Sequence, residues 1–149
     1  MPRRLPNVDV RLVEWQTSVL GRPFEWGRTD CGALVWSALE AIYPEDDVPL
    51  PPGIRPWRSE PAALRLFARV GGVAGALRAG GAETVPLAFA QNGDIIIAAG
   101  PEGGVPGAAI VVGPGYVVAN RERGVERRSL RNLRESDPPG ALEVWRPPL

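Results

Sequence analysis

The sequence predicts a single α+β domain, in which helices come first and an antiparallel sheet follows. Apolar side chains recur at helical spacing through the first half of the chain, up to about residue 79. From residue 82 onward, short apolar runs alternate with turn residues, as in strands joined by hairpins. This separation of helices and strands along the chain is typical of α+β domains. The 149 residues contain no repeat or linker, so we expect residues 1–149 to form one domain.

Each predicted helix has a recognisable start or end. Asp9 can cap a first helix that ends at Gly21, and Asp30 can cap a second. Ser59, followed by a proline in the first turn, begins a third helix, which the Gly-Gly pair at residues 71–72 interrupts. The helices are therefore expected at residues 9–20, 30–42, 59–70 and 72–79.

Strands are expected where apolar runs are bounded by turn residues. The Asn-Gly pair at residues 92–93 is a turn signal before the first strand, and Gly-Pro-Gly at residues 113–115 joins the second to the third. The proline-rich segment 44–58 is expected to be a loop without regular structure. The strands are expected at residues 94–99, 108–112, 116–119, 125–130 and 142–145.

The composition excludes several function classes. Seventeen basic and seventeen acidic residues give a net charge of zero, so we expect neither nucleic acid nor an anionic membrane as a partner. The chain has one cysteine and no histidine, which excludes an internal disulfide and argues against a zinc site. No metal or cofactor is therefore expected. No signal peptide or membrane-length apolar run is visible, which favours synthesis in the cytoplasm without Sec export.

The single cysteine, Cys31, is the strongest candidate for chemistry. It follows the predicted cap Asp30 at the start of a helix, where unpaired N–H groups favour a thiolate. Cysteine hydrolases also need an imidazole to accept and move the proton, and this chain has none. The alternative is a core residue, because Cys31 is in register with the apolar stripe of Leu34, Val35 and Leu39. Asp30 is better explained as the helix cap than as a catalytic neighbour.

Three short motifs carry a resemblance to a known family. They are Pro-Phe-Glu-Trp-Gly at residues 23–27 followed by Asp30-Cys31, Asn-Gly-Asp-Ile-Ile at residues 92–96, and Ala-Ile-Val-Val-Gly at residues 109–113. In this order they resemble the nucleophile region and the first two core strands of the NlpC/p60-type, papain-like peptidoglycan peptidases. The resemblance implies a papain-like NlpC-type domain, with N-terminal helices packed on a C-terminal antiparallel sheet.

The chain is still more similar to a group of NlpC-like proteins from phage and prophage tail-gene clusters. It shares with them a Gly-Gly pair after the third helix and a closing Trp145-Arg146, so the similarity covers nearly the whole chain. This similarity implies a structural or assembly component of a phage tail, at the tail tip. Its partners would be other tail proteins, and it would be assembled into the virion after synthesis in the bacterial cytoplasm.

The chain departs from the active peptidases at the catalytic base. Their histidine precedes the second of these strands, and the corresponding place here is near Gly107. Their third, orienting polar residue lies about a dozen residues further on, near Asn120. The resemblance therefore leaves Cys31 and Asn120 as catalytic candidates without a base. Asp94 could accept a proton, although its place in a turn favours a structural role. The alternative function is an active cysteine hydrolase that cleaves peptidoglycan stem peptides during infection, with a base from another chain or an unusual carboxylate.

Aromatic and basic residues mark candidate interaction surfaces. Trp36 lies off the apolar stripe of its helix, and Trp57 ends the proline-rich loop between Arg55 and Arg58. Aromatic anchors flanked by arginine are common in protein interfaces, so these four residues are interface candidates. Packing of the two indoles beneath their own loop is the alternative. The arginine-rich segment 121–134 is a second possible docking edge, although its glutamates favour a solvated face.

Overall fold

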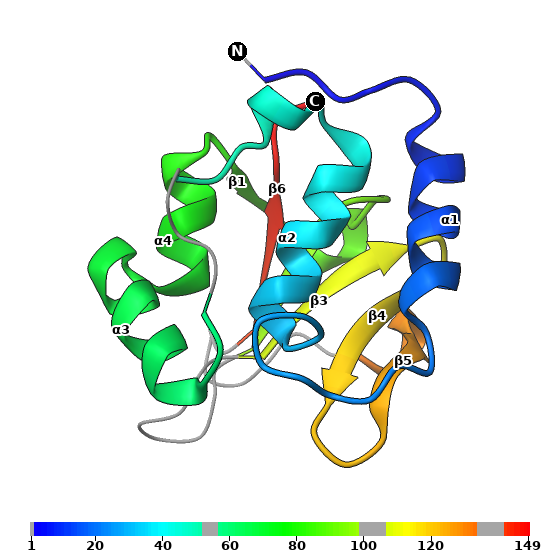
Figure 1. Ribbon diagram of the computed structural model, residues 1–149. Coiled ribbons are helices and arrows are strands. Elements are labelled where there is room, and N and C mark those ends of the chain that lie inside the picture. Colours follow the sequence, from blue (N-terminus) through cyan, green and yellow to red (C-terminus); the bar gives the residue numbers. More distant parts are fainter. Residues whose placement is uncertain (1, 52–56, 99–106, 134–141) are drawn as a thin grey trace.

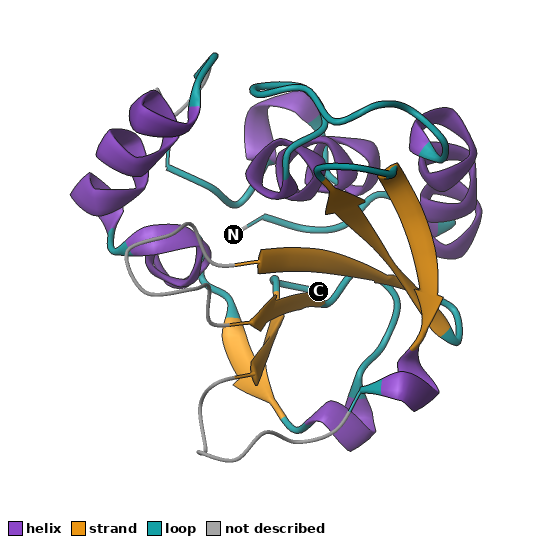
Figure 2. Ribbon diagram, turned by 90° about the horizontal axis from the view of Figure 1, so that it is seen from below, coloured by secondary structure: helices purple, strands orange, loops and turns teal. Residues whose placement is uncertain are grey.

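Helices cover one face of an antiparallel sheet in the computed structural model, which describes residues 2–51, 57–98, 107–133 and 142–149. In these residues there are four α-helices and a six-stranded sheet, so the predicted α+β class is confirmed (Figure 1). Two helices, α1 and α2, lie in front of strands β3 and β4. The sheet is strongly twisted and curved, as Figure 2 shows.

The helices agree with the predicted order, with one correction at a cap. Asp30 accepts a hydrogen bond from the N–H of Ala33, and Ser59 accepts one from Ala62, so both predicted caps are confirmed. Asp9 is not the cap of the first helix, because that helix begins earlier, after Asn7. The helices are α1 at Val8–Val19, α2 at Cys31–Ile42, α3 at Glu60–Val70 and α4 at Gly72–Ala79.

The strands pair antiparallel in the order β1-β6-β2-β3-β4-β5. The C-terminal strand therefore lies inside the sheet, between β1 and β2 (Figure 1). Residue 99, the predicted end of the first strand, lies outside the described residues. The strands are β1 at Glu83–Val85, β2 at Ile95–Ala98, β3 at Gly107–Val112, β4 at Gly115–Asn120, β5 at Gly124–Ser129 and β6 at Leu142–Arg146.

Alternation along the strands builds an apolar cluster on each face of the sheet. On β3, Ala108, Ile110 and Val112 pack with the helices, whereas Ala109 and Val111 pack on the opposite face. Two short 3-10 turns, Leu87–Phe89 and Leu130–Asn132, supply leucines to that opposite face. Within the described residues, no helix has the length and apolar character needed to cross a membrane.

An ion pair ties the C-terminal strand to the start of β2. The guanidinium of Arg146 donates from Nε to Oδ1 of Asp94 at 3.1 Å and from Nη2 to Oδ2 at 2.9 Å. The Asp94 carboxylate is fully buried and also accepts the N–H of Gln91. This paired geometry is the strong form of an arginine–carboxylate contact. The Gly-Asp and Trp-Arg motifs of the sequence therefore meet in one interaction, which leaves Asp94 a structural role.

Replacing Asp94 with asparagine should lower the free energy of unfolding by about 3 kcal/mol, because it leaves the arginine of a largely buried pair without its charge partner. Denaturant titration followed by far-UV circular dichroism measures this loss. The matched control is Glu126→Gln, which breaks exposed contacts to Arg123 and Arg128 and should change stability little. Equal effects of the two substitutions would contradict a structural role for the buried pair.

Candidate functional site

The loop before Cys31 is held in shape by its own hydrogen bonds. The hydroxyl of Thr29 donates to the carbonyl of Pro23 and accepts the N–H of Glu25, both at 2.7 Å. Gly27 has a φ of 84°, and a Cβ at that position would lie 2.0 Å from the carbonyl oxygen of Trp57. Only glycine fits this turn, because a side chain would collide with the backbone of residue 57. The Trp-Gly pair is thus explained by a close approach of two chain segments.

The carboxylate of Asp30 joins that loop to helix α2 and to the segment at Trp57. Its Oδ1 accepts the N–H of Ala33 at 3.0 Å, and its Oδ2 accepts the N–H of Gly27 at 2.6 Å. The same Oδ2 accepts the indole N–H of Trp57 at 2.9 Å. Asp30 is only 2 % exposed, so its carboxylate loses its hydrogen bonds to water on folding. These three donors replace them.

Cys31 is the first residue of α2, and its thiol faces the beginning of β3. Burial raises the pKa of the Cys31 thiol, and the negative charge of Asp30 raises it further. Backbone hydrogen bonds at Ala108 and Gly32 act in the opposite direction without offsetting these effects. Backbone N–H groups at the helix start do favour the thiolate, as expected, but burial and the adjacent carboxylate outweigh them, so the net shift of the pKa is upward.

Among the described residues, the strand position tied to the thiol is Ala108, whose backbone hydrogen-bonds to Cys31. Ala108 and Ala119 belong to the same helix-facing cluster as Cys31. The β3–β4 register pairs Ala109 with Val118, which places Ala108 directly opposite Ala119. Gly107 lies one residue earlier, so alternation directs its Cα–H toward the other face, where a Cβ would meet open space. The place expected for a base near Gly107 is thus occupied, on the side of Cys31, by Ala108.

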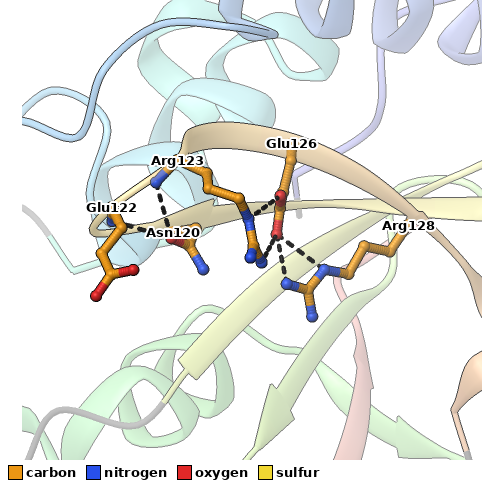
Figure 3. A network of polar contacts seen from close by, with 5 residues as sticks. All are labelled: Asn120, Glu122, Arg123, Glu126 and Arg128. Atoms are coloured by element: carbon orange, nitrogen blue, oxygen red, sulfur yellow. Dashed lines mark hydrogen bonds and ion pairs between the residues drawn. The ribbon is translucent and has the colours of Figure 1, made fainter.

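Asn120 is used by a turn and does not face Cys31. Its Oδ1 accepts the N–H groups of Glu122 and Arg123, both at 2.9 Å, which closes the turn between β4 and β5 (Figure 3). Strand alternation places Asn120 on the face opposite to Ala119. The structure therefore does not bring Asn120 together with Cys31. Nor does Asp94 approach the thiol, because it adjoins the Val111 end of β3 while Cys31 contacts the Ala108 end.

The interface candidates have mixed outcomes. Trp57 is 2 % exposed and packs edge-to-face on Phe67, so its prediction as a surface anchor is wrong: its N–H has a buried partner in Asp30 and its ring a buried neighbour. Trp36 is partly buried against the same apolar cluster. Arg58 is exposed, as an interface residue needs to be, and Arg55 lies outside the described residues.

The arginine-rich segment satisfies much of its charge internally. Glu126 pairs with both Arg123 and Arg128 on the exposed surface of β5, as Figure 3 shows. Arg127 points elsewhere and donates to the carbonyl of Val112. This arrangement agrees better with a solvent-exposed surface whose charges pair with one another than with a docking edge for a partner.

The sequence did not identify Arg121 as a structural residue. Its side chain joins the turn after β4 to the loop before α2 and to the start of α3. Its guanidinium lies over the rings of Trp26 and Phe24, with 5.2 and 5.9 Å to the ring centroids. It also pairs with Glu60 at the start of α3, at 3.1 Å. These partners are far apart in the sequence, so no local pattern could have identified them. Within the described residues, no three His, Cys, Asp or Glu side chains gather as a metal site would require.

A family model matches most of the chain. The model of a family described as "Domain of unknown function (DUF6950)" matches residues 3–136. No curated protein matches the chain in sequence.

Replacing Asp30 with asparagine should lower the free energy of unfolding by about 3 kcal/mol, because the amide keeps one acceptor oxygen for three buried donors. Denaturant titration measures the loss. The comparison variant is Ser59→Ala, which removes one cap hydrogen bond, to the N–H of Ala62, and should cost less. A loss from Asp30→Asn no larger than that from Ser59→Ala would show that the carboxylate is not the common anchor.

Iodoacetamide should alkylate Cys31 slowly in the native protein at neutral pH, because burial and Asp30 keep the thiol protonated. Since the folded-state pKa is raised, the alkylation rate should still be rising above pH of about 8.5, the ordinary value for cysteine. Mass spectrometry of the native and the unfolded protein over a pH series measures both rates.

A matched pair of variants tests which strand position faces the thiol. Ala108→His places an imidazole on the side of Cys31 and should speed alkylation at neutral pH, whereas Gly107→His places it on the opposite face and should not. Circular dichroism checks that both variants fold. Faster alkylation in Gly107→His alone would contradict the assignment of faces.

Proposed function

We infer that this chain, which belongs to the DUF6950 family, is a non-catalytic papain-like domain that serves as a structural or assembly component of a phage or phage-like tail. Two lines of support lead to this proposal. The geometry around Cys31 supports the loss of peptidase chemistry. The resemblance to proteins of tail-gene clusters, which extends to the closing Trp145-Arg146, supports the tail and its tip as the place of action.

The observation that carries the non-catalytic part is the alanine beside the thiol at the start of β3, in a chain without histidine. A cysteine nucleophile needs a neighbouring base, and a third polar group normally orients that base. Here Ala108 lies at the strand position beside Cys31, and Ala119 of the neighbouring strand belongs to the same apolar cluster. Loss of a general base typically costs about 10²- to 10⁴-fold in rate. The raised pKa of Cys31 adds a further penalty at neutral pH, because less of the thiol is ionised.

The contacts around the former nucleophile region support a role as a scaffold. Asp30 anchors the loop and the segment at Trp57, and Arg121 joins that loop to α3 and the β4–β5 turn. Each of these polar groups is committed to holding chain segments together. A rigid surface built in this way suits assembly with partner proteins, because little ordering is needed on binding.

One observation favours the alternative, an active cysteine hydrolase acting on peptidoglycan stem peptides. Backbone hydrogen bonds at Ala108, Gly32 and Cys31 itself favour the ionised sulfur, although they do not prevail. Such an enzyme would need its base from a partner chain placed over Ala108. It would therefore be active in the assembled particle and inactive as the isolated chain.

Complementation with Cys31→Ala separates the two functions. In a phage that carries this gene, deletion should abolish complete tails, and mass spectrometry of purified wild-type particles should detect the chain. The Cys31→Ala protein should restore both particle formation and infectivity, because the thiol contributes no chemistry. Purified wild-type protein should release no stem-peptide fragments from peptidoglycan.

The contrary results are equally specific. Particles that assemble normally with Cys31→Ala but fail to infect would favour the hydrolase. Absence of the chain from purified particles would overturn the tail role. Release of stem-peptide fragments that depends on Cys31 would overturn the proposal that the site is inactive.

A further inference from the structure

A polar pocket of about 510 Å³ lies on the surface beside the loop that precedes Cys31. Its volume is within the range of ligand-binding pockets. One wall comes from that loop and the other from the segment before α3. The lining residues are Glu25, Trp26, Gly27, Arg28, Trp57 and Arg58. The thiol of Cys31 is not among them, since it faces β3.

The two walls of this pocket are fixed to one another. Gly27 donates its N–H to Asp30, and Trp57 donates its indole N–H to the same oxygen. The backbones of residues 27 and 57 are so close that only glycine fits between them. The guanidinium of Arg121 lies over the Trp26 ring, 5.2 Å from its centroid. The pocket is therefore preorganised, which lowers the entropic cost of binding a ligand.

The charged groups of the pocket favour an anion. Arg28 and Arg58 outnumber Glu25, and both arginines are exposed. The Nε of Arg28 lies 3.6 Å from Glu25, with side chains 78 % and 59 % exposed, so this pair is weak and easily rearranged. Arg58 forms no ion pair within the described part of the chain. At least one guanidinium fork is thus available to a carboxylate.

We propose that this pocket binds the carboxylate of an acidic residue in a partner protein. The two guanidiniums recognise the carboxylate, and the Trp26 indole supplies an apolar wall for the adjacent methylene groups. Glu25 on the rim can accept a backbone N–H of the same peptide, and its negative charge works against a compact dianion such as phosphate. The proposal does not depend on the tail role, because the pocket exists in the isolated chain.

The test follows the backbone amides of Gly27 and Arg28 by ¹H–¹⁵N correlation NMR during titration of the full-length protein. The probes are the blocked tripeptides acetyl-Gly-Glu-Gly-amide and acetyl-Gly-Gln-Gly-amide, and inorganic phosphate. The glutamate peptide should shift these signals in a saturable manner, and added salt should weaken its binding. The glutamine peptide should not shift them, because it lacks the charge.

Arg58→Gln and Arg28→Gln should each weaken binding of the glutamate peptide about tenfold, as loss of a charge-assisted contact predicts. Arg65→Gln, an exposed position on α3 outside the pocket, is the matched control and should bind normally. Absence of saturable shifts with the glutamate peptide would overturn the proposal, as would equal binding of the two peptides. Tighter binding of phosphate than of the glutamate peptide would show a general anion site and would also overturn it.

Discussion

The buried carboxylate of Asp30 is the constraint on which the rest of this structure depends. It accepts hydrogen bonds from the first turn of α2, from the turn at Gly27 and from the indole of Trp57 at the same time. Three segments that are separate in the sequence therefore share one acceptor group. A buried charge with fewer donors would destabilise the fold, so the geometry of all three segments is coupled.

The same carboxylate links stability to the state of the neighbouring thiol. Its negative charge, together with burial, opposes ionisation of Cys31, and no imidazole compensates. In a cysteine hydrolase a positively charged partner would offset this effect. Here Ala108 lies beside the thiol, and together with Ala119 it belongs to the apolar core that packs against Cys31. The contacts of this region therefore serve packing.

A second buried carboxylate, Asp94, has the corresponding role in the sheet. Its ion pair with Arg146 places the last strand beside β2, although the two strands are separated by most of the sheet in the sequence. Arg4 adds to this closure by donating to the carbonyl groups of Pro147 and Pro148. Both ends of the chain are thus attached to the same edge of the core (Figure 1).

Much of the fold could be predicted from local features of the sequence. Periodicity, caps and turn signals identified the helices and most strands in their order, because these depend on neighbouring residues. Asp30 as a cap was correct because it needs only the N–H of Ala33, three residues away. Asp9 as a cap was wrong, since its carboxylate instead accepts from the side chain of Asn92.

The sequence by itself determined that the chain has no imidazole, and hence that Cys31 lacks an ordinary base. Only the tertiary structure decided which side chains meet the thiol. A shift of one residue reverses the face of a strand, so proximity in sequence to Gly107 and Asn120 could not distinguish them from Ala108 and Ala119. The burial of Trp57 could not be predicted from the sequence either, because an indole after a proline-rich loop can face solvent or the core. Its burial depends on Asp30, 27 residues earlier, and such distant pairings arise from packing rather than from local pattern.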